Sequence, residues 1–232
     1  MVIGMRRFIG QSKFSGDGRR QHIGFELFAR EYENGRWSLP TDFNAITATD
    51  IRRMPSEALL HLDFTTELIS FNLEQRQFID PDYVEAVALV QSRTPITLIT
   101  ELTERADDTV TLEQLQRGAK RFHDAGLKVC IDDVGTGSNN LDLVTALAPY
   151  VDEYKFALQN LRPFDHIPEI APKLDYWYNF AENQHKTLAI EGIETAPGVA
   201  ELESDYPCDI LQGYYLAKPA PLPKGNQLHW NF

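Results

Sequence analysis

The chain has 232 residues, of which 34 are acidic and 22 are basic, so its net charge is −12. A hydrophobic content of 43% is enough to fill a substantial core and excludes general disorder. The acidic balance argues against a non-specific nucleic-acid binder, and we expect no DNA partner. It leaves room for a small phosphorylated substrate if metal cations reverse the local charge.

The sequence carries no sign of secretion or of membrane insertion. Cys130 and Cys208 are the two cysteines, too few for a disulfide scaffold or a zinc ribbon. The N-terminus lacks a long apolar region, and no segment approaches 18 consecutive apolar residues. We therefore expect a cytoplasmic protein without a membrane association.

The first 30 residues favour a β-hairpin. Arg6–Phe14 and His22–Arg30 favour strands, and Ser15–Gly18 contains two glycines that favour a turn. Six later apolar runs favour strands, at Leu68–Leu73, Ile96–Leu102, Leu127–Ile131, Val151–Phe156, Thr187–Ile190 and Ile210–Tyr214. Helical patterns lie between them, at Pro81–Gln91, Thr111–Ala125, Asn140–Ala148, Ile170–Gln184 and Pro197–Ser204.

This alternation predicts an α/β fold with a mostly parallel sheet covered by helices. Two hairpin strands and six later strands make eight, which suits a closed barrel. A tight hairpin joins antiparallel neighbours, so the first strand should run against the others. We therefore predict a modified (β/α)8 TIM-type barrel with one antiparallel strand, as a single domain over residues 1–232. An open doubly wound sheet is the alternative, although no Gly-rich first turn supports it.

Polar residues stand at the end of each predicted strand. In a parallel barrel these ends converge on one mouth, where catalytic groups gather. Carboxylates so close repel one another unless cations neutralise them, and an all-oxygen ligand set favours Mg²⁺ or Mn²⁺ over zinc. The residues are Glu26, Asn72, Glu101, Asp132, Asp133, Lys155, Glu191 and Gln212.

Taken one at a time, several of these residues have a simpler structural explanation. Glu26 could cap a helix, Asn72 could form a turn, and Glu101 with Glu104 could begin a helix. A lone lysine such as Lys155 is usually exposed. The segment 131–137, Ile-Asp-Asp-Val-Gly-Thr-Gly, is more specific, because adjacent carboxylates beside two glycines suit a metal-bridging site next to a loop.

These residues belong to motifs that together resemble the EAL domain, the cyclic di-GMP phosphodiesterase module, over essentially the whole chain. The matching segments are Gly24-Phe25-Glu26-Leu27-Phe28-Ala29-Arg30, Phe71-Asn72-Leu73, Glu101-Leu102-Thr103-Glu104, Ile131 to Gly137, Lys155, Glu191-Gly192-Ile193-Glu194-Thr195 and Leu211-Gln212-Gly213-Tyr214-Tyr215. EAL domains are modified (β/α)8 barrels with one antiparallel strand, as the hairpin already suggests.

The resemblance implies hydrolysis of cyclic di-GMP to linear pGpG by a homodimer that binds two Mg²⁺ or Mn²⁺ ions. The implied metal ligands are Glu26, Asn72, Glu101, Asp132, Asp133 and Glu191. Lys155 resembles the lysine that orients and deprotonates the attacking water. Arg30 resembles the arginine that contacts the substrate phosphate, and Gln212 the polar residue beneath that site. Glu104 resembles the glutamate that anchors the loop after Asp133.

Several segments depart from the family pattern, and two of them bear on the expected activity. Lys155-Phe156-Ala157 stands where the family has Lys-Ile-Asp, and Val134 and Ser138 replace two aromatic residues of the loop. We therefore expect a loop that is mobile without ligand and a low activity. The alternative is a catalytically weak or inactive EAL-like protein that binds cyclic di-GMP or a protein partner as a regulator. A barrel enzyme acting on another phosphoester is a third interpretation.

Overall fold

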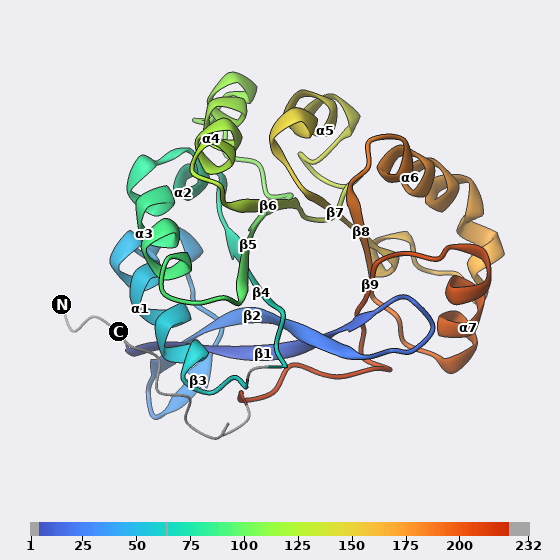
Figure 1. Cartoon of the computed structure of the whole chain (residues 1–232), viewed down its shortest axis with the longest axis horizontal. Coiled ribbons are helices and arrows are strands. Elements are labelled where there is room, and N and C mark those ends of the chain that lie inside the picture. The colour runs from blue at the N-terminus through green and yellow to red at the C-terminus, as the bar shows by residue number, and fades with distance from the viewer. Residues whose placement is uncertain (1–4, 64, 223–232) are drawn as a thin grey trace.

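A computed structural model describes residues 5–63 and 65–222, which form a barrel surrounded by helices (Figure 1). Eight strands close the barrel, because β1 pairs with both β2 and β9. Their bounds are β1 (Met5–Ser15), β2 (His22–Glu33), β4 (Leu68–Leu73), β5 (Thr97–Leu102), β6 (Lys128–Ile131), β7 (Glu153–Ala157), β8 (Thr187–Glu191) and β9 (Ile210–Leu211). Strand β1 is antiparallel to both neighbours, and the other barrel pairs are parallel. The predicted modified barrel with one antiparallel strand is confirmed.

Helices lie outside the barrel, between successive strands (Figure 1). They are α1 (Ala48–Leu59), α2 (Gln75–Ile79), α3 (Pro81–Gln91), α4 (Leu112–Asp124), α5 (Leu141–Leu147), α6 (Ala171–Asn183) and α7 (Ala196–Asp205). Side-chain caps define where several begin: Thr47 and Thr111 each form a capping box with the residue three positions later. No helix in the described ranges is long and apolar enough to cross a bilayer.

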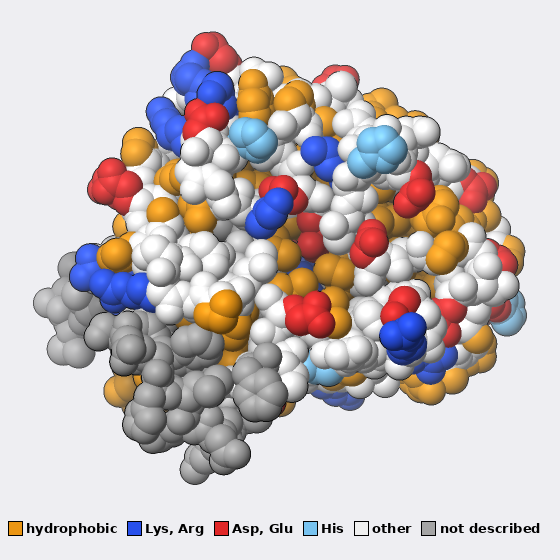
Figure 2. Space-filling view, viewed as in Figure 1, with side chains coloured by type: hydrophobic (Ala, Val, Ile, Leu, Met, Phe, Trp, Pro, Cys, Tyr) orange, Lys and Arg blue, Asp and Glu red, His pale blue; other side chains and the backbone are white. Residues whose placement is uncertain are grey.

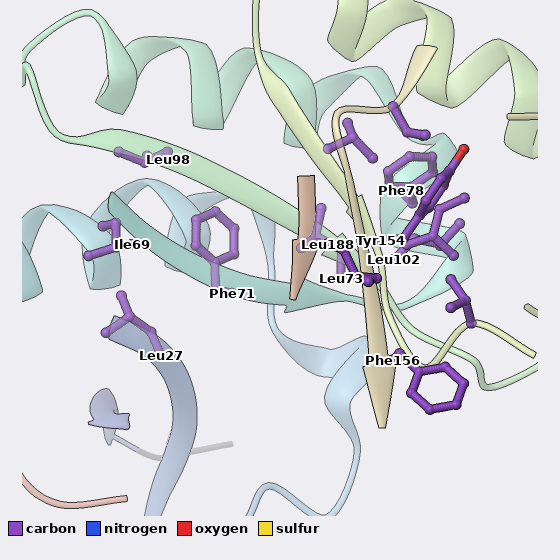
Figure 3. Close-up of a cluster of buried hydrophobic side chains, with 14 of the residues drawn as sticks. Leu27, Ile69, Phe71, Leu73, Phe78, Leu98, Leu102, Tyr154, Phe156 and Leu188 are labelled. Carbon is purple, nitrogen blue, oxygen red and sulfur yellow. The ribbon is translucent and has the colours of Figure 1, made fainter. Parts of the chain in front are cut away.

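Alternation along the strands separates the core from the site, because successive strand side chains point to opposite faces. On β4, Ile69, Phe71 and Leu73 point outward into the apolar layer under the helices, and Asn72 points into the barrel. The same alternation holds on β7, where Tyr154 and Phe156 belong to the apolar layer. Figure 3 shows the apolar side chains of β4 and β7 together with Leu27, Phe78, Leu98, Leu102 and Leu188. The outward residues therefore stabilise the barrel, and the inward residues are free to be polar.

The structure contains three elements that the sequence did not predict, and it shortens one predicted strand. Helices α1 and α2 and strand β3 (Arg36–Ser38), which pairs with β2, were not predicted. The expected strand at Ile210–Tyr214 ends at Leu211, because Gly213 packs against the backbone of Ile193 and the chain turns there. A side chain at Gly213 would place its Cβ 2.2 Å from the Ile193 carbonyl oxygen.

Candidate active site

The carboxyl ends of the parallel strands open into a cavity of about 600 Å³. In the space-filling view, acidic and basic side chains lie at the bottom of a hollow near the centre of the face shown (Figure 2). Nine of the residues predicted from the sequence line the cavity: Glu26, Arg30, Asn72, Glu104, Asp132, Asp133, Lys155, Glu191 and Gln212. The tenth, Glu101, is fully buried beneath them. The structure thus brings the predicted residues to one place.

Lys155 lies at the centre of the carboxylates. Its Nζ is 2.6 Å from Oε2 of Glu101, 3.0 Å from Oδ1 of Asp132, 3.1 Å from Oε2 of Glu26 and 3.3 Å from Oε2 of Glu191. Burial alone would lower the pKa of Lys155, but Asp132 and Glu101 raise it well above its ordinary value. The side chain is therefore held as an ammonium ion by four carboxylates that lie in, or directly after, four different strands.

Glu26 is held by hydrogen bonds from two amides as well as by Lys155. The Asn72 side chain donates to Oε1 over 3.1 Å, and the Gln212 side chain donates to Oε2 over 2.8 Å. Burial and repulsion from Glu101 raise the pKa of Glu26 to about 7. Gln212 lines the cavity but is only 1% exposed, and its hydrogen bond orients Glu26.

Three carboxylates at the cavity wall form a group that fits a divalent cation. Glu104, Asp132 and Asp133 each offer an oxygen, and these oxygens lie within 4.8 Å of one another. Oδ1 of Asp133 is buried and accepts no hydrogen bond, and Oδ1 of Asn72 is in the same state. Burial and the neighbouring Glu191 raise the pKa of Asp133 to about 7. Oxygen atoms that are desolvated and unpaired in this way fit Mg²⁺, Mn²⁺ or Ca²⁺, which take oxygen ligands.

The loop after Asp133 is tied to the barrel by polar contacts. Ser138 donates to the backbone carbonyl of Glu104 from both its amide, at 2.9 Å, and its hydroxyl, at 2.8 Å. Gln75 donates to the same hydroxyl over 2.9 Å. Val134 is 2% exposed and belongs to the core. Glu104 thus holds the loop through its carbonyl, which leaves its carboxylate beside Asp132 and Asp133.

Two further residues complete the cavity wall. Glu191 accepts a hydrogen bond from the Gln159 side chain over 2.7 Å, which leaves its other oxygen toward Lys155. Arg30 lines the cavity, and its guanidinium donates to the backbone carbonyl of Ala29 over 2.9 Å. Because one contact uses only part of its donor fork, Arg30 keeps N–H groups for an anionic ligand.

Four site residues had no recognisable signal in the sequence. Lys13 is fully buried inside the barrel and donates to Oε1 of Glu101 over 2.8 Å. Glu153, also buried, lies 3.8 Å from the Lys13 ammonium group. Gln159 follows β7, and Arg105 pairs with Glu74 at the cavity wall. The alternation of side chains along a strand predicts that Lys13 and Glu153 point into the barrel. It does not predict whether a charged side chain at such a position is buried or exposed.

Fold and site together define a (β/α)8-type barrel with a carboxylate cluster able to hold divalent cations at its mouth. The chain belongs to the EAL domain family, whose model matches residues 42–219. This membership confirms the resemblance inferred from the motifs. The first motif, which carries Glu26 and Arg30, precedes the matched range, and the structure places both residues at the cavity.

Two curated relatives match about half of the chain. The probable cyclic di-GMP phosphodiesterase PdeN of Escherichia coli is 26% identical over 125 residues, which are 54% of this chain and 23% of that protein. The cyclic di-GMP phosphodiesterase NbdA of Pseudomonas aeruginosa is 29% identical over 130 residues, which are 53% and 15%. The matched region is therefore under a quarter of the length of either relative.

A solved structure supports the fold over nearly the whole chain. The Bacillus subtilis YkuI protein, which has an EAL domain, was solved in complex with cyclic di-GMP and calcium. Its structure matches with a TM-score of 0.73 and 21% identity, covering 93% of this chain and 55% of that chain. The likeness establishes the barrel.

Proposed function

We propose that the chain is a divalent-metal-dependent phosphodiesterase that hydrolyses cyclic di-GMP to linear pGpG. The observation that carries the proposal is the Lys155 ammonium group at the floor of an EAL-family cavity, surrounded by four carboxylates. The named activity of PdeN and NbdA and the ligands of YkuI support this choice of substrate. We expect the reaction to take place in the cytoplasm, where the buried free thiols of Cys130 and Cys208 stay reduced.

Each of the residues that would hold two Mg²⁺ or Mn²⁺ ions has a side-chain oxygen at the floor or wall of the cavity. When bound, the ions supply Lewis-acid activation and neutralise charge on the phosphodiester. The proposed ligands are Glu26, Asn72, Glu101, Asp132, Asp133 and Glu191. The position of the Glu104 carboxylate makes it a further oxygen donor on the Asp132–Asp133 side.

Side chains of the chain itself would position the water and the substrate. Lys155 Nζ can orient a water molecule at the cavity floor and hold a proton at that atom. Gln159 and Gln212 fix the carboxylates of Glu191 and Glu26 by hydrogen bonds, so that these ligands need little reorganisation. Arg30 can donate two parallel N–H groups to a phosphate of cyclic di-GMP.

A second candidate function is a catalytically weak or inactive protein that binds cyclic di-GMP or a protein partner. It is favoured by Ala157, the last residue of β7, which pairs with Glu191 in the sheet and offers no oxygen ligand to the cavity. We also propose a homodimer, on the resemblance to the family alone.

Hydrolysis by the purified chain tests both functions. Cyclic di-GMP would be incubated with Mg²⁺, with Mn²⁺ or with EDTA, and linear pGpG measured by chromatography. We expect product with either metal and none with EDTA. Glu26→Gln keeps the size of the side chain but removes its charge, and it should abolish turnover. Binding of cyclic di-GMP without metal-dependent product would contradict the phosphodiesterase and support the regulator.

A further inference from the structure

A second buried lysine lies in the barrel beneath the cavity. Lys13 extends inward from β1, the antiparallel strand, and its side chain is fully buried. Its Nζ donates to Oε1 of Glu101 over 2.8 Å and lies 3.8 Å from Oε1 of Glu153. Burying an ammonium ion and a carboxylate is costly unless each has a partner in good geometry. The contact with Glu101 supplies that geometry.

The sheet register places the partners of Lys13 at one level of the barrel. Glu101 of β5 is in register with Cys130 of β6, and Cys130 is in register with Glu153 of β7. Cys130 and Glu153 do not line the cavity, and neither does Lys13. A charged layer of Lys13 and Glu153 therefore lies under the carboxylates of the site, and its two charges cancel.

Glu101 connects this lower layer to the site. Its Oε1 accepts from Lys13, and its Oε2 accepts from Lys155 over 2.6 Å. Two ammonium groups on opposite oxygens fix both the rotation and the depth of the carboxylate. With Lys155 alone, Glu101 could rotate about its terminal bond, and Glu153 would repel it from below.

We propose that Lys13 is a positioning residue that holds Glu101 in the orientation needed for metal binding. The inference rests on the proposed function, since Glu101 is one of the proposed ligands. Partners that orient metal ligands commonly change metal affinity by about 10–100-fold when they are removed. Lys13 acts through Glu101 and touches neither the substrate nor the cavity.

A charge-balanced double variant tests the role of Lys13. Lys13→Met combined with Glu153→Gln removes one positive and one negative charge, so the net charge of the interior is unchanged. Glu153→Gln alone is the matched control, because it keeps the contact between Lys13 and Glu101. Mn²⁺ binding would be measured on metal-stripped protein by calorimetry, together with the melting temperature.

We expect the double variant to bind Mn²⁺ about 10–100-fold more weakly than the wild type. The control should lose less affinity than the double variant. If the double variant does not fold, Lys13→Gln with Glu153→Gln replaces it, and its amide should give an intermediate loss. An unchanged Mn²⁺ affinity with a lowered melting temperature would overturn the proposal, because Lys13 would then be purely structural.

The outcomes separate this proposal from the proposed function. A wild type that hydrolyses cyclic di-GMP, with equal Mn²⁺ affinity in the double variant, would overturn only the role of Lys13. A wild type that binds Mn²⁺ without hydrolysing cyclic di-GMP, with a weakened double variant, would overturn only the phosphodiesterase. A crystal structure of the double variant with Glu101 unmoved would also contradict the positioning role.

Discussion

Replacing Lys155 with methionine should lower the stability of the metal-free protein and strengthen the response of that stability to divalent metal. Methionine has a similar length but no charge, so the four carboxylates within 3.3 Å of the ammonium group would lose their common partner. Lys155 is 1% exposed, so methionine would leave these carboxylates largely desolvated and without a counter-charge. The expected loss is therefore that of a broken buried ion pair.

Removing one partner of a buried pair costs about 3–5 kcal/mol, a large part of the roughly 5–15 kcal/mol that stabilises a typical protein. For a chain of this size, about 1 kcal/mol lowers the melting temperature by about 2–4 °C, so a fall of about 10 °C is expected in EDTA. Mn²⁺ can take over the carboxylates, and a ligand at 100 times its Kd returns about 2.7 kcal/mol. Most of the loss should thus be recovered with Mn²⁺.

Thermal unfolding of both proteins in EDTA and in a Mn²⁺ series measures the effect. Lys128→Met is the control, because Lys128 pairs with Asp152 at the surface and its side chain is 53% exposed. A surface pair contributes about 0–1 kcal/mol, so the control should change little and show no added response to metal. Equal melting temperatures for the Lys155 and Lys128 variants, or an equal response to Mn²⁺, would refute the reasoning. In parallel, hydrolysis by Lys155→Met should be slower by about 10²–10⁴-fold.

The remaining predictions concern pH, the substrate contact and the loop. The pKa of Glu26 is about 7 in the folded protein and 4.5 in its ordinary state, so the folded protein binds a proton more tightly than the unfolded chain. The protein should therefore lose about 3 kcal/mol of its free energy of unfolding as the pH rises from below 4.5 to 7. Denaturant unfolding in EDTA should show this loss, and Glu26→Gln should remove it. Arg30→Ala should weaken cyclic di-GMP binding in Ca²⁺ by about 10–100-fold, measured by calorimetry, with no change in melting temperature. Gly135→Ala places a Cβ 2.6 Å from Nε1 of Trp177 at a φ of +83°, so it should lower both stability and Mn²⁺ affinity. The control Gly18→Ala, at a φ of +80° with no atom within 4 Å, should affect stability alone.

The site was predictable because barrel geometry converts sequence position into spatial position. Each predicted ligand follows or ends an apolar run, and parallel strands bring such positions to one mouth. The orientation of the side chains followed as well, since Asn72 and Lys155 each stand between two outward apolar neighbours. Knowing the period of a strand was therefore enough to place these groups in one cavity.

Elements outside that rule were missed for identifiable reasons. Helix α1 contains Pro55, and proline usually interrupts a helix. The polar residues before Pro55 make the apolar periodicity of this segment hard to recognise in the sequence. Strand β3 follows Asn34-Gly35, a dipeptide typical of two-residue hairpin turns, and both residues have positive φ. This dipeptide is visible in the sequence, so the hairpin of β2 and β3 is predictable from it. Lys13 gave no usable signal, because its partner Glu101 comes from a strand 88 positions away.

The loop after Asp133 shows how this chain differs from the family pattern without losing order in its contacts. Where the family has two aromatic side chains, Val134 contributes buried apolar area, and Ser138 forms hydrogen bonds to Glu104 and Gln75. Replacing Ser138 would remove the hydroxyl that makes these two contacts. That the loop is mobile without ligand stays a prediction. Because Glu104 holds the loop by its carbonyl and faces Asp132 and Asp133 with its carboxylate, a cation bound there would be coupled to the loop through one residue.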